Sequence, residues 1–259
     1  MFAGFDLNLT DIDFTYKEDG NRLFLENKRK VENELSEFLN KDGVIDGTSI
    51  QNNWFPQIET DVFISHSHND FDKAIALAGW LKHHFKLNVF IDSCVWGSAD
   101  ALLKKIDDDY CLISDGGSYS YEKRNYSTSH VHTMLTVALS SIIDKAECLL
   151  FLNTPNSIST KDVIQQQTNS PWIYLEIVMS QLVRKEKPGR KILKKSLFEN
   201  AQKELNINYR LDMEHLHPLT LQDLHNWNHS FSKADAIIHP LDMLYKQHNL
   251  TEDFSLLLG

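Results

Sequence analysis

The sequence predicts an α/β protein whose core is a largely parallel sheet flanked by helices. Three short apolar runs, at residues 61–65, 87–92 and 146–153, have the length and composition of buried strands. Segments with apolar residues three or four positions apart lie between these runs and after them. Strands that alternate with helices are typical of βαβ units, because parallel strands need a long crossover connection.

The expected helices have recognisable starts. Ser67 and Asp70 fit a capping box at the start of the helix that follows the first strand. A second helix is expected at 132–146, directly before the third strand. Another begins at Ser170 and Pro171, with serine as the N-cap and proline at the first helical position.

The main domain is expected at 59–185, with an extension on either side. Residues 1–58 are predicted to be an N-terminal extension packed on the core, with a small strand or arm at 1–16 and an amphipathic helix at 21–40. A loop with two Asp-Gly turn signals follows that helix. Residues 186–259 are predicted to be a C-terminal extension of the same body, with helices at 191–204, 219–229 and 234–248 and an edge strand at 207–213.

Two polar segments interrupt the alternation of strands and helices. Residues 94–129 are interpreted as an insertion, with a short helix and then a tyrosine-rich loop. A polar loop rich in tyrosine is more typical of a lid or a contact surface than of a core. The second segment is the long loop at 153–170, directly after the third strand.

Charge and cysteine content limit the kinds of partner and the compartment. The net charge of −10 argues against electrostatic binding to nucleic acid or to an anionic membrane. The basic run at 184–195 is broken by Glu186 and is interpreted as a solvated helix face. Three cysteines without motif spacing do not form a disulfide framework, and no apolar stretch reaches membrane-spanning length. A cytoplasmic protein is therefore expected.

Three segments are expected to meet at one edge of the sheet. Ligands of open parallel α/β sheets bind beyond the carboxyl ends of the strands. Residues 65–68, 92–97 and 153–170 each follow a predicted strand. The helix N-terminus that begins at Ser67 offers free N–H groups, which suit a phosphate. Trp96, in the second of these segments, either contacts a substrate or anchors its loop.

Glu176 is the most informative single residue. It lies on or beside the apolar stripe of its helix, and its neighbours three and four positions away are Trp172, Ile173, Met179 and Ser180, none of them basic. A carboxylate near an apolar face is costly unless another group engages it. Either Glu176 lies on a flank and reaches solvent, or it faces the strand-end crevice and acts on a substrate.

Three His-x-His pairs are candidate metal ligands: His66 and His68, His130 and His132, and His215 and His217. A zinc site needs a third or fourth ligand, and no cysteine or acid has the spacing to supply one. The sequence therefore predicts no metal site. His66 is interpreted as a pocket residue, and His130 and His132 as a helix start or as neighbours of the pocket.

Four blocks in order resemble Toll/interleukin-1 receptor (TIR) domains. The segment TDVFISHSHNDFDKAIALAGWLK resembles their first strand and helix, and NVFIDS resembles the second strand entering the BB loop. AECLLFLNTPNS resembles the third strand, and SPWIYLEIVMS resembles the helix in which Trp and Glu occur four apart, as Trp172 and Glu176 do. The resemblance covers roughly residues 60–185 and implies a flavodoxin-like sheet.

The resemblance also implies an activity. Enzymatic TIR domains cleave the nicotinamide–ribose bond of NAD⁺, and their required glutamate corresponds to Glu176. NAD⁺ is then a substrate rather than a cofactor, Trp172 helps to wall the site, and Ser65, His66 and Ser67 line its nucleotide end. Asp92, at the end of the second strand, is a further candidate for binding the substrate. Many bacterial relatives act in antiphage defence: some destroy NAD⁺, and others, as in the Thoeris type, convert it to a cyclic or conjugated ADP-ribose signal for a downstream effector protein. Self-association is also expected.

Two alternatives stay open at the sequence level. The segment DSCVWGSAD lacks the Arg-Asp-x-x-Pro-Gly of many receptor TIR domains, which argues against a receptor adaptor. One alternative is a non-enzymatic TIR scaffold that acts by self-assembly. The other is an enzyme like the nucleoside deoxyribosyltransferases, which share a flavodoxin-like sheet and a single glutamate.

Overall fold

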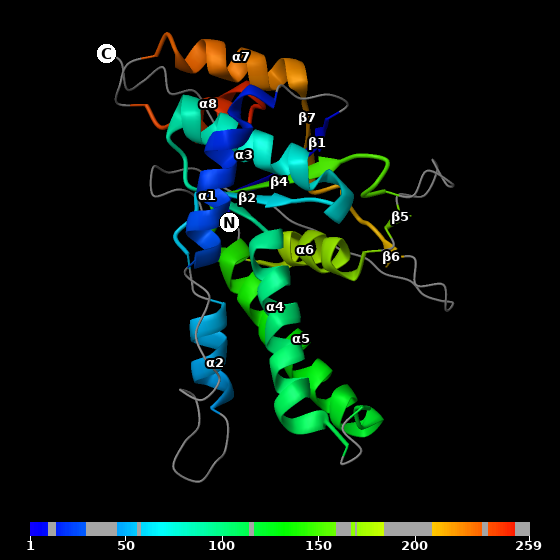
Figure 1. The fold of residues 1–259 in the computed structure, drawn as a ribbon. Helices are drawn as coiled ribbons and strands as arrows, with labels where there is room; N and C mark the ends of the chain where they lie inside the picture. The colour runs from blue at the N-terminus through cyan, green and yellow to red at the C-terminus, as the bar shows by residue number, and fades with distance from the viewer. Residues whose placement is uncertain are drawn as a thin grey trace.

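A five-stranded parallel sheet forms the centre of the protein (Figure 1). The computed structural model describes residues 1–9, 14–29, 46–55, 58–113, 117–158, 167–168, 170–183, 209–234 and 238–251. The strands are β1 (Ala3–Asn8), β2 (Val62–Ser65), β3 (Val89–Ile91), β4 (Cys148–Asn153) and β7 (Leu216–Thr220). Their order is β3-β2-β4-β1-β7, and every pairing is parallel. The predicted α/β class is confirmed.

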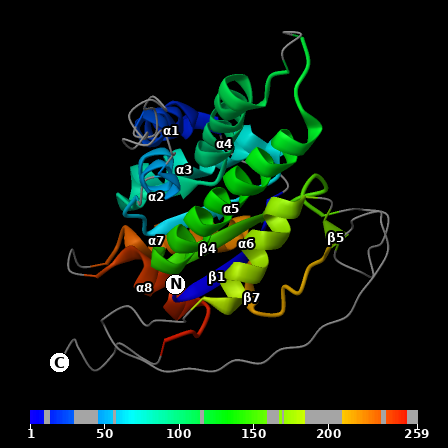
Figure 2. The same cartoon turned by 90° about the horizontal axis from the view of Figure 1, so that it is seen from below.

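Helices cover both faces of this sheet (Figures 1 and 2). α3 (Phe71–Phe85) and α7 (Leu221–Phe231) lie on one face, where Trp227 stacks on Phe85 with ring centroids 3.9 Å apart. α5 (Tyr121–Lys145) and α6 (Pro171–Leu182) lie on the other face. Around them pack α1 (Lys17–Arg29), α2 (Gly47–Trp54), α4 (Ser93–Ile106) and α8 (Pro240–Gln247).

β1 is an interior strand of the sheet. It lies between β4 and β7, with Ala3 aligned with Cys148 and Gly4 aligned with Leu216. Phe5 and Leu7 are fully buried. The first part of the segment predicted as an N-terminal extension therefore belongs to the sheet itself rather than to a peripheral arm.

Two glycines allow α1 and α3 to cross at very short range. A Cβ atom on Gly20 would lie 1.9 Å from the carbonyl oxygen of Ile75, and one on Gly79 would lie 1.9 Å from that of Tyr16. No side chain larger than a hydrogen fits at either position without moving backbone. This crossing fixes the helix that was predicted at 21–40, which is observed at 17–29; residues 30–45 lie outside the described part.

The prediction of a strand-end loop at 92–97 is wrong. Asp92 caps α4 by accepting a hydrogen bond from the N–H of Ser93, and the helix continues to Ile106. A single π-helical turn follows at Asp107–Cys111. The tyrosine-rich loop expected up to residue 129 is also wrong in its second half, because α5 begins at Tyr121 with Ser120 as its N-cap. α4 and α5 pack side by side and extend away from the sheet (Figure 1).

The C-terminal part supplies a strand that the sequence pattern did not indicate, β7. The expected helices near 219–229 and 234–248 are confirmed as α7 and α8. The expected edge strand is β6 (Tyr209–Arg210), which pairs antiparallel with β5 (Gln167–Thr168) in a separate two-stranded sheet. The helix expected at 191–204 and the basic run at 184–195 lie outside the described residues.

Two further observations bear on the sequence predictions. Cys94, Cys111 and Cys148 are all free and buried. Among the residues that the structure describes, no helix combines the length and the apolar character needed to cross a membrane.

Candidate functional site

The site lies at the carboxyl edge of the sheet, where β2 and β4 are neighbours. The chain leaves β2 for β3 on one side and then returns past β2 to β4 on the other. Such a topological switch point opens a crevice beyond the strand ends. Ser65 ends β2, Asp92 follows β3, and Thr154 follows β4. The observed topology therefore brings the three predicted segments to one edge.

Three side chains gather there around Glu176, and all four residues are 0% exposed: Ser65, His66, Asp92 and Glu176. The hydroxyl of Ser65 donates a hydrogen bond to Oε2 of Glu176 at 2.6 Å. The backbone N–H of His66 donates to Oδ2 of Asp92 at 3.2 Å, and Nδ1 of His66 lies 2.5 Å from Oδ1 of Asp92. The alternative in which Glu176 reaches solvent is wrong.

Burial and mutual repulsion keep the two carboxyl groups from ionising together. Burial raises the pKa of Glu176 well above its usual value, and the charge of Asp92 raises it further. Burial likewise raises the pKa of Asp92 well above its usual value, although the N–H groups of His66 and Ser93 oppose this. The pair therefore keeps a proton to higher pH than two exposed carboxyl groups would.

His66 is neutral in this setting. Burial lowers its pKa to about 4, although the nearby charges of Glu176 and Asp70 favour the protonated form. Its contact with Asp92 at neutral pH is therefore a contact of an uncharged imidazole with a carboxyl group rather than an ion pair. His66 has a structural position beneath the site and orients Asp92.

The start of α6 follows the sequence prediction and explains the orientation of Glu176. Ser170 is the N-cap and accepts a hydrogen bond from the N–H of Ile173, with Pro171 in the first turn. The buried face of the helix then consists of Ile173, Glu176, Ile177 and Ser180. Spacings of three and four place Glu176 in the middle of this face, toward the sheet.

The predicted capping box at Ser67 and Asp70 is wrong. Ser67 precedes the short 3-10 turn His68–Asp70, but its side chain makes no capping hydrogen bond. Asp70 instead accepts hydrogen bonds from the side chains of Thr154 and Asn156 and lies 3.1 Å from Nζ of Lys73. This buried aspartate ties the loop after β2 to the loop after β4, so it fixes the two sides of the crevice relative to each other.

A cavity of about 420 Å³ is lined in part by chain neighbours of the two carboxyl residues. Its wall combines the rings of Phe24, Phe71, His132 and Trp172 with polar and small or aliphatic members: His68, Ser93, Asp100, Gly97, Ala99 and Leu135. The rings of His132 and Trp172 meet edge to face with centroids 5.5 Å apart. Ser93 directly follows Asp92, and Trp172 lies one helical turn before Glu176. The two carboxyl residues are not part of this lining, and both are 0% exposed.

The structure treats the predicted site residues differently. It brings Ser65, His66, Asp92 and Glu176 together and places Trp172 in the cavity wall. Ser67 is half-exposed and outside that wall. Trp96 lies on α4 rather than in a loop, and its side chain is outside the described part.

Sequence reasoning missed several of the residues that matter at this edge. Phe24 and Phe71 follow the apolar periodicity of helices, which indicates buried core residues rather than the wall of a cavity. Asp70 was interpreted as a capping residue. For His132 the sequence left two possibilities open, a helix start or a position near the pocket. The structure places it inside α5 and in the cavity wall.

The His-x-His pairs do not form metal sites within the described residues. His66 is buried while His68 is exposed, and His130 and His132 lie on a helix, where positions two apart face different directions. His215 contacts the hydroxyl of Ser180, with Nε2 and Oγ 2.8 Å apart. His217 packs beside Phe5, with ring centroids 5.8 Å apart.

No protein-family model matches the chain, and neither the curated proteins nor the solved structures include a match to it. Its function is therefore inferred from the residues of the site.

Proposed function

We propose that the protein is a TIR-type enzyme that cleaves the nicotinamide–ribose bond of NAD⁺, with Glu176 as the catalytic carboxylate. The observation that carries this proposal is the setting of Glu176. Its carboxyl group is buried at the carboxyl edge of a parallel sheet, hydrogen-bonded to Ser65, coupled to Asp92, and next to an aromatic cavity.

The chemistry needs only one carboxylate at the reacting carbon. The bond between C1′ of the ribose and N1 of nicotinamide breaks, and its electron pair returns to the cationic ring, which leaves as neutral nicotinamide. No general acid is required, unlike in ordinary glycosidases. Glu176 then stabilises the positive charge that develops on the ribose, or forms a transient ribosyl ester. Water, or a hydroxyl or ring nitrogen, attacks C1′ and loses a proton.

The raised pKa of the carboxyl pair suits a cationic substrate. In the free protein the pair carries less negative charge than two exposed carboxyl groups would, because burial penalises ionisation. A nicotinamide ring brought next to Glu176 offsets that penalty, since an opposite charge favours the ionised form. Ser65 already donates a hydrogen bond to Oε2, which holds the carboxylate in one orientation. A bound cation would therefore favour the ionised form of Glu176.

The cavity fits the other parts of a dinucleotide. Its volume falls within the range of about 300–1,000 Å³ that is usual for small-molecule sites. Phe71 and Trp172 offer flat faces to a base, and Ser93 and Asp100 offer hydrogen-bonding groups to ribose hydroxyls. Because Trp172 lines the cavity and stands one helical turn before Glu176, we infer that a turn of the tryptophan side chain joins the carboxylate to the cavity.

The alternative function is a scaffold that acts by self-assembly. Two observations favour it: the full burial of Glu176, and a group of exposed tyrosines where α4 and α5 meet, with Tyr121 79% and Tyr126 70% exposed. An exposed aromatic group at the end of a projecting helix pair suits a protein contact. Enzymatic action and assembly are compatible, since family members often need assembly for activity.

Incubation with NAD⁺ and mass spectrometry of the nucleotides separates these functions. The wild-type protein is expected to release nicotinamide and to form linear, cyclic or conjugated ADP-ribose, the last two being candidate signals for an effector. Glu176→Gln should abolish this, whereas Glu122→Gln, on the exposed start of α5, should not. Base exchange on a deoxyribonucleoside with NAD⁺ left intact would indicate a deoxyribosyltransferase. Self-association without turnover, at high protein concentration as well, would indicate the scaffold.

A further inference from the structure

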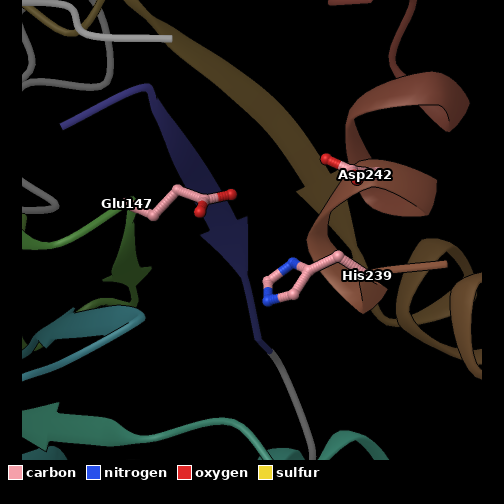
Figure 3. Close-up of side chains that lie close together, drawn as sticks. All are labelled: Glu147, His239 and Asp242. Carbon is pink, nitrogen blue, oxygen red and sulfur yellow. The ribbon is translucent and has the colours of Figure 1, made fainter. Parts of the chain in front are cut away.

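A second group of ligand-type side chains lies at the opposite edge of the sheet. It consists of Glu147, which directly precedes β4, and His239 and Asp242 at the start of α8. One ligand atom from each residue can be chosen so that all three lie within 4.8 Å of one another. Figure 3 shows His239 and Asp242 reaching from α8 toward the carboxylate of Glu147. The two segments are 92 residues apart in the chain (239 − 147), so only the fold brings them together.

We propose that Glu147, His239 and Asp242 bind a divalent transition-metal ion of the zinc type, which joins α8 to the start of β4. One imidazole with two carboxylates is a ligand set that such ions accept. Two carboxylates also supply the two negative charges that neutralise the ion. Calcium and magnesium are less suited, because they prefer oxygen ligands throughout. This inference does not rest on the proposed NAD⁺ chemistry.

Other contacts fix the backbone at Glu147 and beside His239, and the N–H of Asp242 donates a hydrogen bond to the carbonyl oxygen of His239 at 3.1 Å. The carbonyl oxygen of Glu147 accepts hydrogen bonds from the N–H groups of Phe2 at 2.7 Å and Ala3 at 3.3 Å. The carbonyl oxygen of Pro240, next to His239, accepts one from Nε1 of buried Trp227 at 2.8 Å. A site held by rigid elements is pre-organised for its ion.

His239 gives independent support for a ligand at this place. It is the N-cap residue of α8, but its side chain makes no capping hydrogen bond. Its Nδ1 atom is buried and has no hydrogen-bond partner in the part of the chain that the structure describes. A buried imidazole nitrogen without a partner costs stability, and coordination would satisfy it. Asp242, only 6% exposed, lies one turn further along the same helix.

The required rearrangement is small. Zinc lies about 2.0–2.2 Å from nitrogen and oxygen ligands, so neighbouring ligand atoms in a tetrahedral site are about 3.3 Å apart. Closing from 4.8 Å takes roughly 1.5 Å at most, which is within the reach of side-chain rotations at half-buried Glu147 and His239. Three protein ligands leave at least one position for water.

The position of the site suggests that its role is structural. β4 spans six residues from this end to the end near Thr154 and Asp70, which is about 20 Å at 3.3 Å per residue. An ion here therefore stabilises the attachment of α8 without contacting the Glu176 site. A ligand that binds only the folded state stabilises that state against unfolding, so zinc should raise the melting temperature of the protein.

Zinc titration of the metal-depleted full chain tests the proposal. We expect one Zn²⁺ per chain by calorimetry, and an affinity loss of at least about tenfold in His239→Ala and in Asp242→Asn. His225→Ala is the matched control, because His225 is exposed on α7. Glu147→Gln gives a further test at a half-buried position that should fold normally, and circular dichroism checks each variant. X-ray absorption should show one nitrogen and two oxygen ligands from the protein.

The proposal fails if the wild type binds no Zn²⁺ at micromolar concentration. It also fails if folded His239→Ala and Glu147→Gln bind as tightly as the wild type, because the ion would then use other histidines among the twelve. Zinc-dependent stabilisation lost in both variants but kept in His225→Ala would support it.

Discussion

Replacing Glu176 by glutamine should change how the stability of the protein depends on pH. The substitution keeps the shape of the side chain and removes its ionisation. In the wild type, burial and Asp92 raise the pKa of Glu176 well above that of the unfolded chain. The native protein therefore holds a proton that the unfolded protein releases. This stability contribution is complete below the unfolded pKa and is lost as pH rises toward the folded pKa.

The size of the effect follows from proton linkage. One extra proton on the native state corresponds to about 1.4 kcal/mol per pH unit between the two pKa values, so two pH units correspond to about 2.7 kcal/mol. His66 acts in the opposite direction, because its pKa is lowered to about 4. Its contribution is present above about 6.5 and is lost as pH falls toward 4. The wild-type curve alone is therefore flattened below pH 6.5.

The difference between wild type and Glu176→Gln removes most of the His66 contribution, because His66 is present in both. Urea unfolding at pH 5.5, 6.5 and 7.5 measures the free energy of unfolding of each protein. The free energy of unfolding of the variant minus that of the wild type should increase as pH rises, by up to about 1.4 kcal/mol per pH unit. Glu122→Gln is the exposed control and should show no such trend. A difference that is constant over this pH range would refute the coupled, buried carboxyl pair.

Two other predictions concern the scaffold around the site. Gly79→Ala should lower the free energy of unfolding by about 1–3 kcal/mol, because its Cβ would lie 1.9 Å from the carbonyl oxygen of Tyr16, directly before α1. Gly97→Ala should raise the free energy of unfolding by roughly 0.5–1 kcal/mol, because a Cβ there meets nothing within 4 Å and alanine favours a helix interior. Chemical denaturation measures both variants, and a Gly79→Ala protein more stable than Gly97→Ala would contradict both predictions. Asp70→Asn should cost about 1–3 kcal/mol, because it weakens the bonds to Thr154 and Lys73, and equal stability of this variant and the wild type in thermal unfolding would show that Asp70 does not join the two loops.

Local signals in the sequence were sufficient for much of the sheet and for α6. The apolar runs gave β2, β3 and β4 nearly to the residue, because each is buried on both faces. Ser170 and Pro171 fixed the start of α6, but the stripe that follows left Glu176 either on a solvent-facing flank or toward the crevice, and the structure decides for the buried side. Where a strand or a cap depends on few neighbours, its pattern is readable in the chain.

Other parts depended on contacts that no local pattern contains. β1 carries Gly4 and Asp6 among its apolar residues, so it resembles a peripheral strand until β4 and β7 are placed on either side of it. Asp92 was assigned to a loop, and it instead begins a helix. Asp70 has the spacing of a capping residue, but its partners lie in a loop more than eighty residues away.

The group of Glu147, His239 and Asp242 shows the same limit. His239 and Asp242 are three apart, which is unremarkable in a sequence, and Glu147 belongs to a different segment. The cavity wall likewise combines Phe24, His132 and Trp172 from three helices. Such sites become visible only when the tertiary structure is known.

Nicotinamide release from NAD⁺, measured for wild-type protein and for folded Glu176→Gln at equal and high concentration, decides whether Glu176 is the catalytic carboxylate. Steady release by the wild type is expected, with a loss of at least about a hundredfold in the variant, comparable to the loss caused by removing one transition-state-stabilising group. Equal release by the two proteins would contradict the assignment of Glu176 as the catalytic carboxylate.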